Sequence, residues 1–353
     1  ARPRCRAIHG VGRGLSGMAA EVNRQIVLAA RPDGNPKQTD FALREAAIPE
    51  PGAGQVLART LWLSLDPYMR LRIGDNEQYF PAVPLGDVVV GGTLSRVVES
   101  RHAGFSAGDF IEAYTGWQDY AVINGAEARK VDPALGPLST ALGVLGMPGL
   151  TAYLGLIDVG KPEPGDTVVG SAAAGAVGAV VGQVAKIAGC RAVGLAGSAR
   201  KIAYLTDELG FDAAINYKTQ EIGAALDRSC PGGINVYFEN VGGVVSEAVY
   251  PRLAGRARVV VCGGVSQYNL NRPQTTVSNL QNILFTEARV CGFNIFSYEA
   301  RYQDGRQRLA RWLAEGRLKY KEDVVDGLEN APQAFRRFFE GETFGKLLVK
   351  VAE

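Results

Sequence analysis

Residues 166–186 constrain this chain more than any other segment, because their sequence, DTVVGSAAAGAVGAVVGQVAK, joins three elements in series. Val168 and Val169 indicate a short buried strand, residues 172–178 form a turn of small residues, and a helix rich in Gly, Ala and Val ends near Lys186. Such a turn lets the backbone approach a pyrophosphate, and the N-terminus of the following helix offers free N–H groups to the anion. The segment therefore predicts a dinucleotide-binding unit.

The turn keeps part of the G-x-G-x-x-G fingerprint, since Gly175 and Gly178 occupy the second and third glycine positions while Ala173 occupies the first. Two other interpretations stay open from the segment alone. A membrane span is disfavoured, because small residues dominate and the run between Asp166 and Lys186 falls short of ~20 strongly apolar residues. A core helix without a ligand would also use Gly/Ala faces for close packing.

The loop after the next predicted strand, which spans residues 191–195, indicates which dinucleotide binds. NAD-dependent proteins carry an acid there, about 20 residues beyond the glycines, to hold the ribose hydroxyls. This loop has no acid and contains Ser198, Arg200 and Lys201 instead. A 2′-phosphate would meet opposite charge and hydrogen-bond donors, which favours NADP over NAD. A solvated basic turn would explain the cations but not the missing acid.

The composition is that of an ordinary globular protein, with 353 residues, 46% of them hydrophobic and 21% charged, and a formal net charge of +2. The length suits two domains, and the scattered, nearly neutral charge predicts neither a nucleic-acid surface nor a membrane partner. Small molecules are the expected partners. The five cysteines are widely spaced without a C-x-x-C pair, so we expect reduced thiols, no cysteine zinc site and a cytoplasmic location.

The first residues differ from the rest of the chain. Residues 1–17 are rich in Arg and Gly and lack the apolar core of a secretory signal, whereas Met18 resembles a natural start. We therefore predict that residues 1–20 are an extension outside the fold.

The remaining pattern predicts two kinds of domain. Residues 23–142 contain short alternating runs broken by Gly and Pro, which is typical of an all-β domain. Beyond Lys201 strands alternate with helices, which predicts a parallel sheet whose ligand lies outside the carboxyl ends of the strands. The closing segment GKLLVKV, residues 345–351, is predicted to return to the first domain as a strand.

The chain resembles the zinc-independent medium-chain dehydrogenases/reductases over about residues 23–351, through LSLDPYMR, GMPGLTAYLGL, AAAGAVG, AGSARKIAYL, FDAAINYK, YFENVGG, VCGGVSQYN and GKLLVKV. This family includes leukotriene and prostaglandin reductases, plant alkenal double-bond reductases and bacterial curcumin reductases. The resemblance implies an α/β fold with a Rossmann domain, a doubly wound parallel sheet at residues 144–316, inserted into a GroES-like β-rich catalytic domain at residues 21–143 and 317–353. It also implies a homodimer and NADPH-dependent reduction of the carbon–carbon double bond of enals and enones.

The resemblance also assigns residues. Tyr268 would face nicotinamide and substrate, and Tyr68 would line the substrate pocket. From the residues alone, a packed aromatic ring is the favoured interpretation of each. The cofactor contacts implied by the family are Gly175, Ala176, Val177, Gly178, Ser198, Lys201, Tyr217, Asn240, Cys262, Gly263, Gly264, Ser266, Tyr268, Phe293, Ile295 and Thr343.

Two positions depart from the family pattern. Thr343 stands where many relatives have Asn in a G-x-N-x-G-K motif, and Gly92 stands where plant forms have a pocket tyrosine. The zinc alcohol dehydrogenases share the architecture, but their Gly-His-Glu would fall on residues 91–93, which read Gly-Gly-Thr. With two histidines in the whole chain, we expect no catalytic metal and no Ser-His hydrolase site.

The implied chemistry passes hydride from C4 of NADPH to the β-carbon of an activated alkene. The enolate oxygen would be stabilised by the Tyr268 hydroxyl, a ribose hydroxyl or backbone N–H groups, and the α-carbon would take its proton from Tyr268 or water. Quinone reduction, or dinucleotide binding without turnover, are the alternatives.

Overall fold

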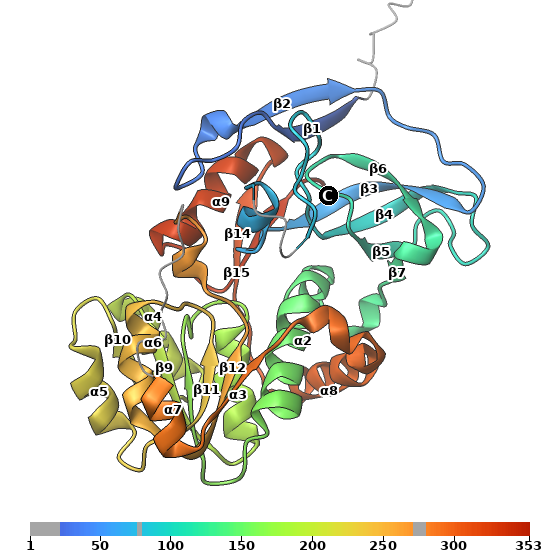
Figure 1. The fold of residues 1–353 in the computed structure, drawn as a ribbon. Helices are drawn as coiled ribbons and strands as arrows, with labels where there is room; N and C mark the ends of the chain where they lie inside the picture. Colours follow the sequence, from blue (N-terminus) through green and yellow to red (C-terminus); the bar gives the residue numbers. More distant parts are fainter. Residues whose placement is uncertain (1–21, 76–79, 271–279) are drawn as a thin grey trace, which may run out of the picture.

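The computed structural model describes residues 22–75, 80–270 and 280–353, and in it the chain forms two lobes (Figure 1). One lobe is built on a seven-stranded sheet with a separate two-stranded sheet beside it, and the other on a six-stranded parallel sheet. Helices pack on the parallel sheet, as Figure 1 shows. The predicted extension, residues 1–20, lies outside the described residues.

The β-rich lobe uses strands from both ends of the chain. Its larger sheet has the order β14-β15-β3-β4-β5-β7, with β6 also paired to β3, while β1 and β2 form the smaller one. These strands are β1 (Asn23–Leu28), β2 (Phe41–Ala46), β3 (Gln55–Ser64), β4 (Thr93–Ser100), β5 (Phe110–Ala113), β6 (Tyr120–Asn124), β7 (Arg129–Lys130), β14 (Glu322–Asp326) and β15 (Lys346–Lys350).

Strands from early and late in the sequence pair in this lobe. Strand β15 pairs antiparallel with β3, with Leu348 opposite Ser64. Helix α9 (Ala331–Glu340) packs beside the sheet, and its Phe335 ring lies 5.8 Å from the ring of Trp117. The chain thus returns to its first sheet, while the domain boundaries at residues 143/144 and 316/317 stay predictions.

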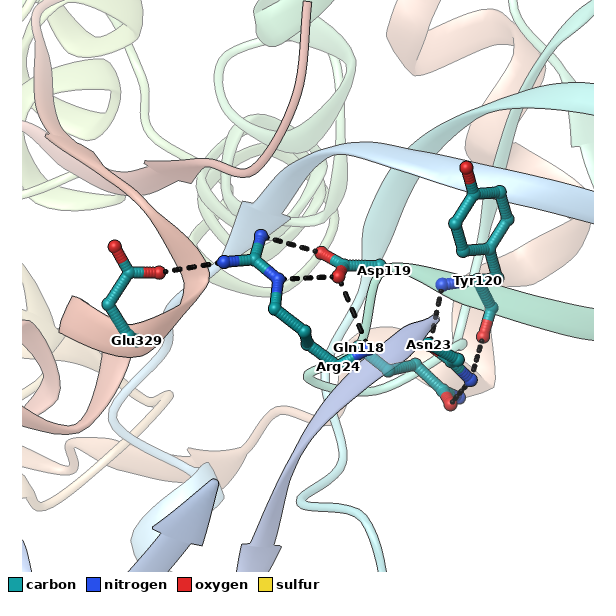
Figure 2. A network of polar contacts seen from close by, with 6 residues as sticks. All are labelled: Asn23, Arg24, Gln118, Asp119, Tyr120 and Glu329. Atoms are coloured by element: carbon teal, nitrogen blue, oxygen red, sulfur yellow. Dashed lines mark hydrogen bonds and ion pairs between the residues drawn. The ribbon is translucent and has the colours of Figure 1, made fainter. Parts of the chain in front are cut away.

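A polar network around β1 includes one contact to the C-terminal part of the chain (Figure 2). The Arg24 guanidinium on β1 binds both carboxylate oxygens of Asp119 at 2.7 and 3.1 Å, and its third nitrogen lies 3.2 Å from Glu329. Asn23 exchanges two 2.9 Å hydrogen bonds with the backbone of Tyr120. Because the Asn23 side chain is buried, these bonds satisfy polar groups that would otherwise be costly to desolvate.

The second lobe is a doubly wound parallel sheet, as predicted. Its strand order is β10-β9-β8-β11-β12-β13, and every pairing is parallel. The strands are β8 (Thr167–Gly170), β9 (Arg191–Ala196), β10 (Ala213–Asn216), β11 (Ile234–Glu239), β12 (Leu253–Val261) and β13 (Arg289–Gly292). The helices are α2 (Met147–Leu154), α3 (Gly178–Ile187), α4 (Ala199–Ala203), α5 (Ile222–Ser229), α6 (Val244–Val249), α7 (Leu280–Thr286) and α8 (Tyr302–Ala314).

Alternate residues of the strands face two separate cores. Val168 on β8 belongs to the core that contains α2, α3 and α8, whereas Val169 belongs to the core that contains α5 and α6. A sheet buried on both faces explains why its strands are continuous apolar runs rather than alternating ones. The segment at residues 166–186 is therefore strand, turn and helix; no helix in the described residues has the length and apolarity of a membrane crossing.

The small residues of α3 allow the helix to lie close to its neighbours. A Cβ built on Gly182 would lie 1.9 Å from Cζ of Phe211, a buried ring of the same core. Ala173, at the first position of the fingerprint, packs in the same way against Gly194 on β9, where a Cβ would come within 2.8 Å of the Ala173 methyl. The methyl that the fingerprint usually lacks is thus accommodated by a glycine on the neighbouring strand.

We expect Gly182→Ala to lower the free energy of unfolding by about 1–3 kcal/mol, because the added methyl overpacks the contact with Phe211. Gly255→Ala is the matched control, since its Cβ would meet nothing within 4 Å. Chemical denaturation of both variants measures the difference. Equal stability of the two variants would contradict this account of the α3 contact.

Candidate active site

A cavity of about 350 Å³ lies between the lobes, at the carboxyl ends of β8, β11 and β12. The β-rich lobe contributes residues 65–68, Thr343 and residues 345–347, and the other lobe contributes the glycine turn. Among its lining residues are these predicted site residues: Tyr68, Gly175, Ala176, Val177, Gly178, Asn240, Cys262, Gly263, Tyr268, Phe293, Ile295 and Thr343. The other predicted contacts lie outside this lining: Ser198, Lys201, Tyr217, Gly264 and Ser266.

The glycine turn is shaped by close backbone contacts. A Cβ on Gly178 would lie 2.5 Å from the Ala172 carbonyl oxygen, so only glycine fits where α3 begins. Ala172 itself has φ +49°, a left-handed conformation that is uncommon for alanine and is associated with functional turns. The N-cap residue Val177 places no side-chain acceptor at the N-terminus of α3, so this end of the helix is suited to an anion.

A second group of predicted residues lies at the end of β9. The Ser198 hydroxyl caps α4 by accepting from the Lys201 N–H at 3.3 Å, and Lys201 Nζ donates to the Gly341 carbonyl at 2.8 Å. The segment 197–201, expected to be a loop, is therefore partly helical, since α4 begins at Ala199. This places Lys201 in the first turn of a helix.

Lys218 belongs to the same group and was missed by the sequence analysis. A Cβ on Gly197 would lie 2.8 Å from the Tyr217 hydroxyl and 3.1 Å from Cε of Lys218. Burial and the Lys218 charge lower the pKa of Lys201, although Asp323 acts in the opposite sense. Two neighbouring ammonium groups repel one another, and a bound phosphate dianion would relieve that repulsion. The sequence could have indicated Lys218, because this cation directly follows Tyr217, which was already a predicted cofactor contact.

Asn240 is held at the cavity by a buried carboxylate. Glu239, which is 5% exposed, accepts hydrogen bonds from the N–H groups of Val241 and Gly242 at 2.8 and 2.9 Å, and from the hydroxyls of Ser171 and Ser246. Asn240 in turn donates from its backbone N–H to Ser171 Oγ at 2.8 Å and from Nδ2 to the Ser171 carbonyl at 2.9 Å. The loop after β11 therefore has a fixed shape.

Tyr268 comes from the loop that follows β12. Its hydroxyl accepts from the Gly264 N–H at 3.4 Å and lies 3.1 Å from the position of a Cβ on Gly263. A Cβ at position 263 would make a tight contact with the phenol oxygen, so a glycine there eases this approach. The phenol is thereby placed at the carboxyl end of the parallel sheet, among the lining residues of the cavity.

Cys262 also lines the cavity. Burial together with the charge of Glu239 raises the pKa of Cys262 to about 12, so that side chain is a neutral thiol.

Tyr68 lines the cavity from the β-rich lobe. Its hydroxyl lies 2.7 Å from the hydroxyl of Tyr114, a partner that the sequence did not indicate. Burial, together with Tyr114 and Asp66, raises the pKa of Tyr68 well above its ordinary value. Tyr68 therefore stays neutral near pH 7, and its hydroxyl acts as a hydrogen-bonding group rather than as a base.

A buried ion pair forms part of the same wall. Lys346 Nζ lies 2.6 Å from Asp66 Oδ1 and donates to the Leu65 carbonyl at 2.9 Å, and Ser64 Oγ bonds the other Asp66 oxygen. Lys346 is 4% exposed and Asp66 6%. Since a buried charge without its partner is strongly destabilising, each side chain fixes the other. This pair was also missed by the sequence analysis.

The two departures from the family pattern have different places. Thr343 lines the cavity. Gly92 is not among the lining residues, and a Cβ built on it would meet no atom within 4 Å. Among the described residues, no group of three or more His, Cys, Asp or Glu side chains is arranged to hold a metal ion. His9 lies outside the described residues.

These features fit a dinucleotide with a 2′-phosphate. The helix N-terminus of α3 suits a pyrophosphate. The group at the end of β9, made of Ser198, Lys201, Tyr217 and Lys218, would supply donors and positive charge to a 2′-phosphate bound there.

Two family models match the chain: "N-terminal domain of oxidoreductase" over residues 24–131 and "Zinc-binding dehydrogenase" over residues 176–315. The NADPH-dependent curcumin reductase of Escherichia coli is 45% identical over 95% of this chain and 99% of that protein. A 2-alkenal reductase (NADP(+)-dependent) of Nicotiana tabacum is 40% identical over 95% of this chain and 99% of that protein.

Among solved structures, CurA from Vibrio vulnificus in complex with NADPH superposes with a TM-score of 0.89. It shares 45% identity with this chain and covers 94% of it and 99% of the other. The matches span both lobes and include the cavity between them, so this chain belongs to the zinc-independent medium-chain dehydrogenase/reductase family.

Proposed function

We propose that this protein is an NADPH-dependent reductase of the carbon–carbon double bond of α,β-unsaturated aldehydes and ketones. One observation carries the proposal: the glycine turn, Asn240 and two tyrosines from different lobes line a single cavity. The names of the curcumin reductase and the 2-alkenal reductase, each covering nearly the whole chain, support the same chemistry. Curcumin-like or prostaglandin-like enones are the finer candidates for substrate.

Such a reaction needs a hydride donor beside the β-carbon and a hydrogen-bond donor beside the carbonyl oxygen. When bound, NADPH supplies the hydride that the β-carbon of the substrate receives. The protein must hold that carbon near the nicotinamide position and stabilise the oxygen that gains charge. We assign Asn240, Phe293 and Ile295 to the cofactor side of the cavity, while Tyr68 and Leu71 line it from the β-rich lobe.

Tyr268 is the proposed donor to the enolate oxygen. A neutral phenol donates one hydrogen bond, and Tyr268, in the loop after β12, is among the residues that line the cavity. The same hydroxyl, or water, would deliver the proton to the α-carbon. Tyr68, kept neutral by burial, is proposed to orient the substrate through its hydroxyl pair with Tyr114.

The proposal is tested by the consumption of NADPH with a panel of enals, enones, quinones and saturated aldehydes, with and without a chelator. We expect turnover with enals and enones that survives chelation. Preference for quinones, or binding of NADPH without turnover of any compound, would reject the proposed activity.

The proposed site residues at the end of β9 predict cofactor selectivity. Lys201→Ala and Lys218→Ala should each weaken NADPH binding by about 1.5–3 kcal/mol and leave NADH binding little changed, because only NADPH presents a phosphate to these ammonium groups. Arg200→Ala is the comparison, since its guanidinium stacks over the Phe344 ring at 5.0 Å and should contribute less. Dissociation constants from calorimetry decide; equal losses for both cofactors would remove these lysines from the role.

The Tyr268 hydroxyl is tested by Tyr268→Phe, which keeps the ring. Loss of one transition-state donor should lower kcat by about 10- to 1000-fold with little change in NADPH affinity. Tyr68→Phe is the matched variant and should raise KM for the enone more than it lowers kcat. If Tyr268→Phe retains the wild-type rate of hydride transfer in a single turnover, the assignment of Tyr268 is wrong.

We further propose a homodimer formed through the β13 edge of the parallel sheet. Strand β13 is the last strand of its sheet, and Val290 on it is 42% exposed, while Leu284 and Phe285 of the adjacent α7 are 73% and 75% exposed. An edge strand with an apolar neighbour is suited to pairing with a second copy.

The free thiols of Cys190 and Cys230, both buried, support a reducing, cytoplasmic location.

Sedimentation should give twice the chain mass of 37.6 kDa for the wild type, and Leu284→Glu should shift the protein towards monomer, because it places a charge within the proposed interface. Leu43→Glu, at an exposed position of the other lobe, should leave the mass unchanged. A monomeric wild type would contradict the dimer.

A further inference from the structure

The segments that carry Tyr68 and Tyr268 are joined by a hydrogen bond across the cleft. Arg70, two residues beyond Tyr68, donates from Nε to Oδ1 of Asn269 at 2.9 Å. Asn269 directly follows Tyr268, so each partner of this bond lies within two residues of one proposed site tyrosine. The two residues are 199 positions apart in the chain and come from different lobes.

Arg70 is unusual because it is a buried cation. It is 7% exposed, and burial lowers its pKa although Asp40, Asp75 and Asp33 act in the opposite sense. The guanidinium also donates to the carbonyl oxygens of Pro32 and Gly34 at 3.2 and 3.1 Å. Burial of an arginine is costly unless its donors are satisfied. Its fixed planar fork therefore defines the place of the Asn269 oxygen.

Asn269 uses both ends of its amide. While Oδ1 accepts from Arg70, Nδ2 donates to Oδ1 of Asn35 at 2.6 Å. The loop before Asn269 is short and makes backbone bonds to its own lobe, from Val265 N–H to Asn240 O at 3.1 Å and from Ser266 N–H to Val241 O at 3.0 Å. Asn269 thus ties this loop to the opposite lobe.

We propose that the Arg70–Asn269 bond fixes the distance between the Tyr68 and Tyr268 hydroxyls across the cavity, which makes Arg70 and Asn269 positioning residues for hydride transfer. This inference rests on the proposed reductase function. Neither residue is a lining residue of the cavity, so both act through the tyrosines beside them. A displacement of about 1 Å in a group that orients the substrate is enough to slow a reaction by about 100-fold.

The test compares Asn269→Ala with Asn269→Asp, because aspartate keeps an oxygen for Arg70 and alanine does not. Asn269→Ala should slow hydride transfer in a single turnover by about 10- to 100-fold, with NADPH affinity and KM for the enone within about threefold of wild type. Asn269→Asp should transfer hydride within about threefold of the wild-type rate. Similar rates for the two variants, or a normal rate in Asn269→Ala, would overturn the inference.

Arg70→Met supplies the second side of a double-mutant cycle. If the two residues act through their mutual bond, the combined variant should be no slower than the slower single variant. Multiplicative losses would show that they act separately. Should Arg70→Met not fold, the two Asn269 variants still decide.

Hydrogen exchange of residues 262–270 in the cofactor-free protein gives a readout independent of activity. Exchange should be faster in Asn269→Ala than in wild type or Asn269→Asp, because the loop loses its tie to the other lobe. Equal exchange in all three proteins would reject the tie. If the wild type reduces no enone yet the exchange pattern holds, the proposed function fails while the structural part of the inference stands.

Discussion

The segment at residues 343–347 joins the two lobes at the point where the cavity forms. Gly345 donates its N–H to the carbonyl of Ala174 in the glycine turn at 2.9 Å, and the next residue, Lys346, pairs with Asp66 of the β-rich lobe at 2.6 Å. A Cβ on Gly345 would lie 2.3 Å from the Lys321 carbonyl oxygen, so a side chain at position 345 would collide with the backbone of Lys321. One short stretch therefore sets the position of the glycine turn relative to the loop that carries Tyr68.

This arrangement explains how an incomplete fingerprint still forms the turn. Ala173 replaces the first glycine, and Gly194 on the neighbouring strand gives its methyl room, whereas Gly178 remains because a Cβ there would collide with the Ala172 carbonyl. The substitution moves the need for a small residue from the turn to the strand beside it. Where the constraint is between backbone atoms, as at Gly178, no neighbour can compensate.

The strand, turn and helix of residues 166–186 could be predicted because their signal is local: a buried strand, glycines at fixed offsets and a helical run of small residues. The return of the C-terminal strand was predicted in the same way and is confirmed by the pairing of β15 with β3. The polar contacts that shape the cavity leave no such signal. Lys346 and Asp66 are 280 residues apart, and Arg70 and Asn269 are 199 apart, so only the folded chain reveals them. Lys218 is the exception, because it adjoins a residue already assigned to the phosphate.

The central claim is that this cavity directs hydride to the β-carbon of the enone rather than to its carbonyl carbon. Reduction of an enone with NADPH deuterated at C4, followed by analysis of the product by NMR, tests that claim most directly. The account predicts a saturated ketone with deuterium at the β-carbon and an intact carbonyl group. An allylic alcohol with deuterium on the carbinol carbon would contradict it.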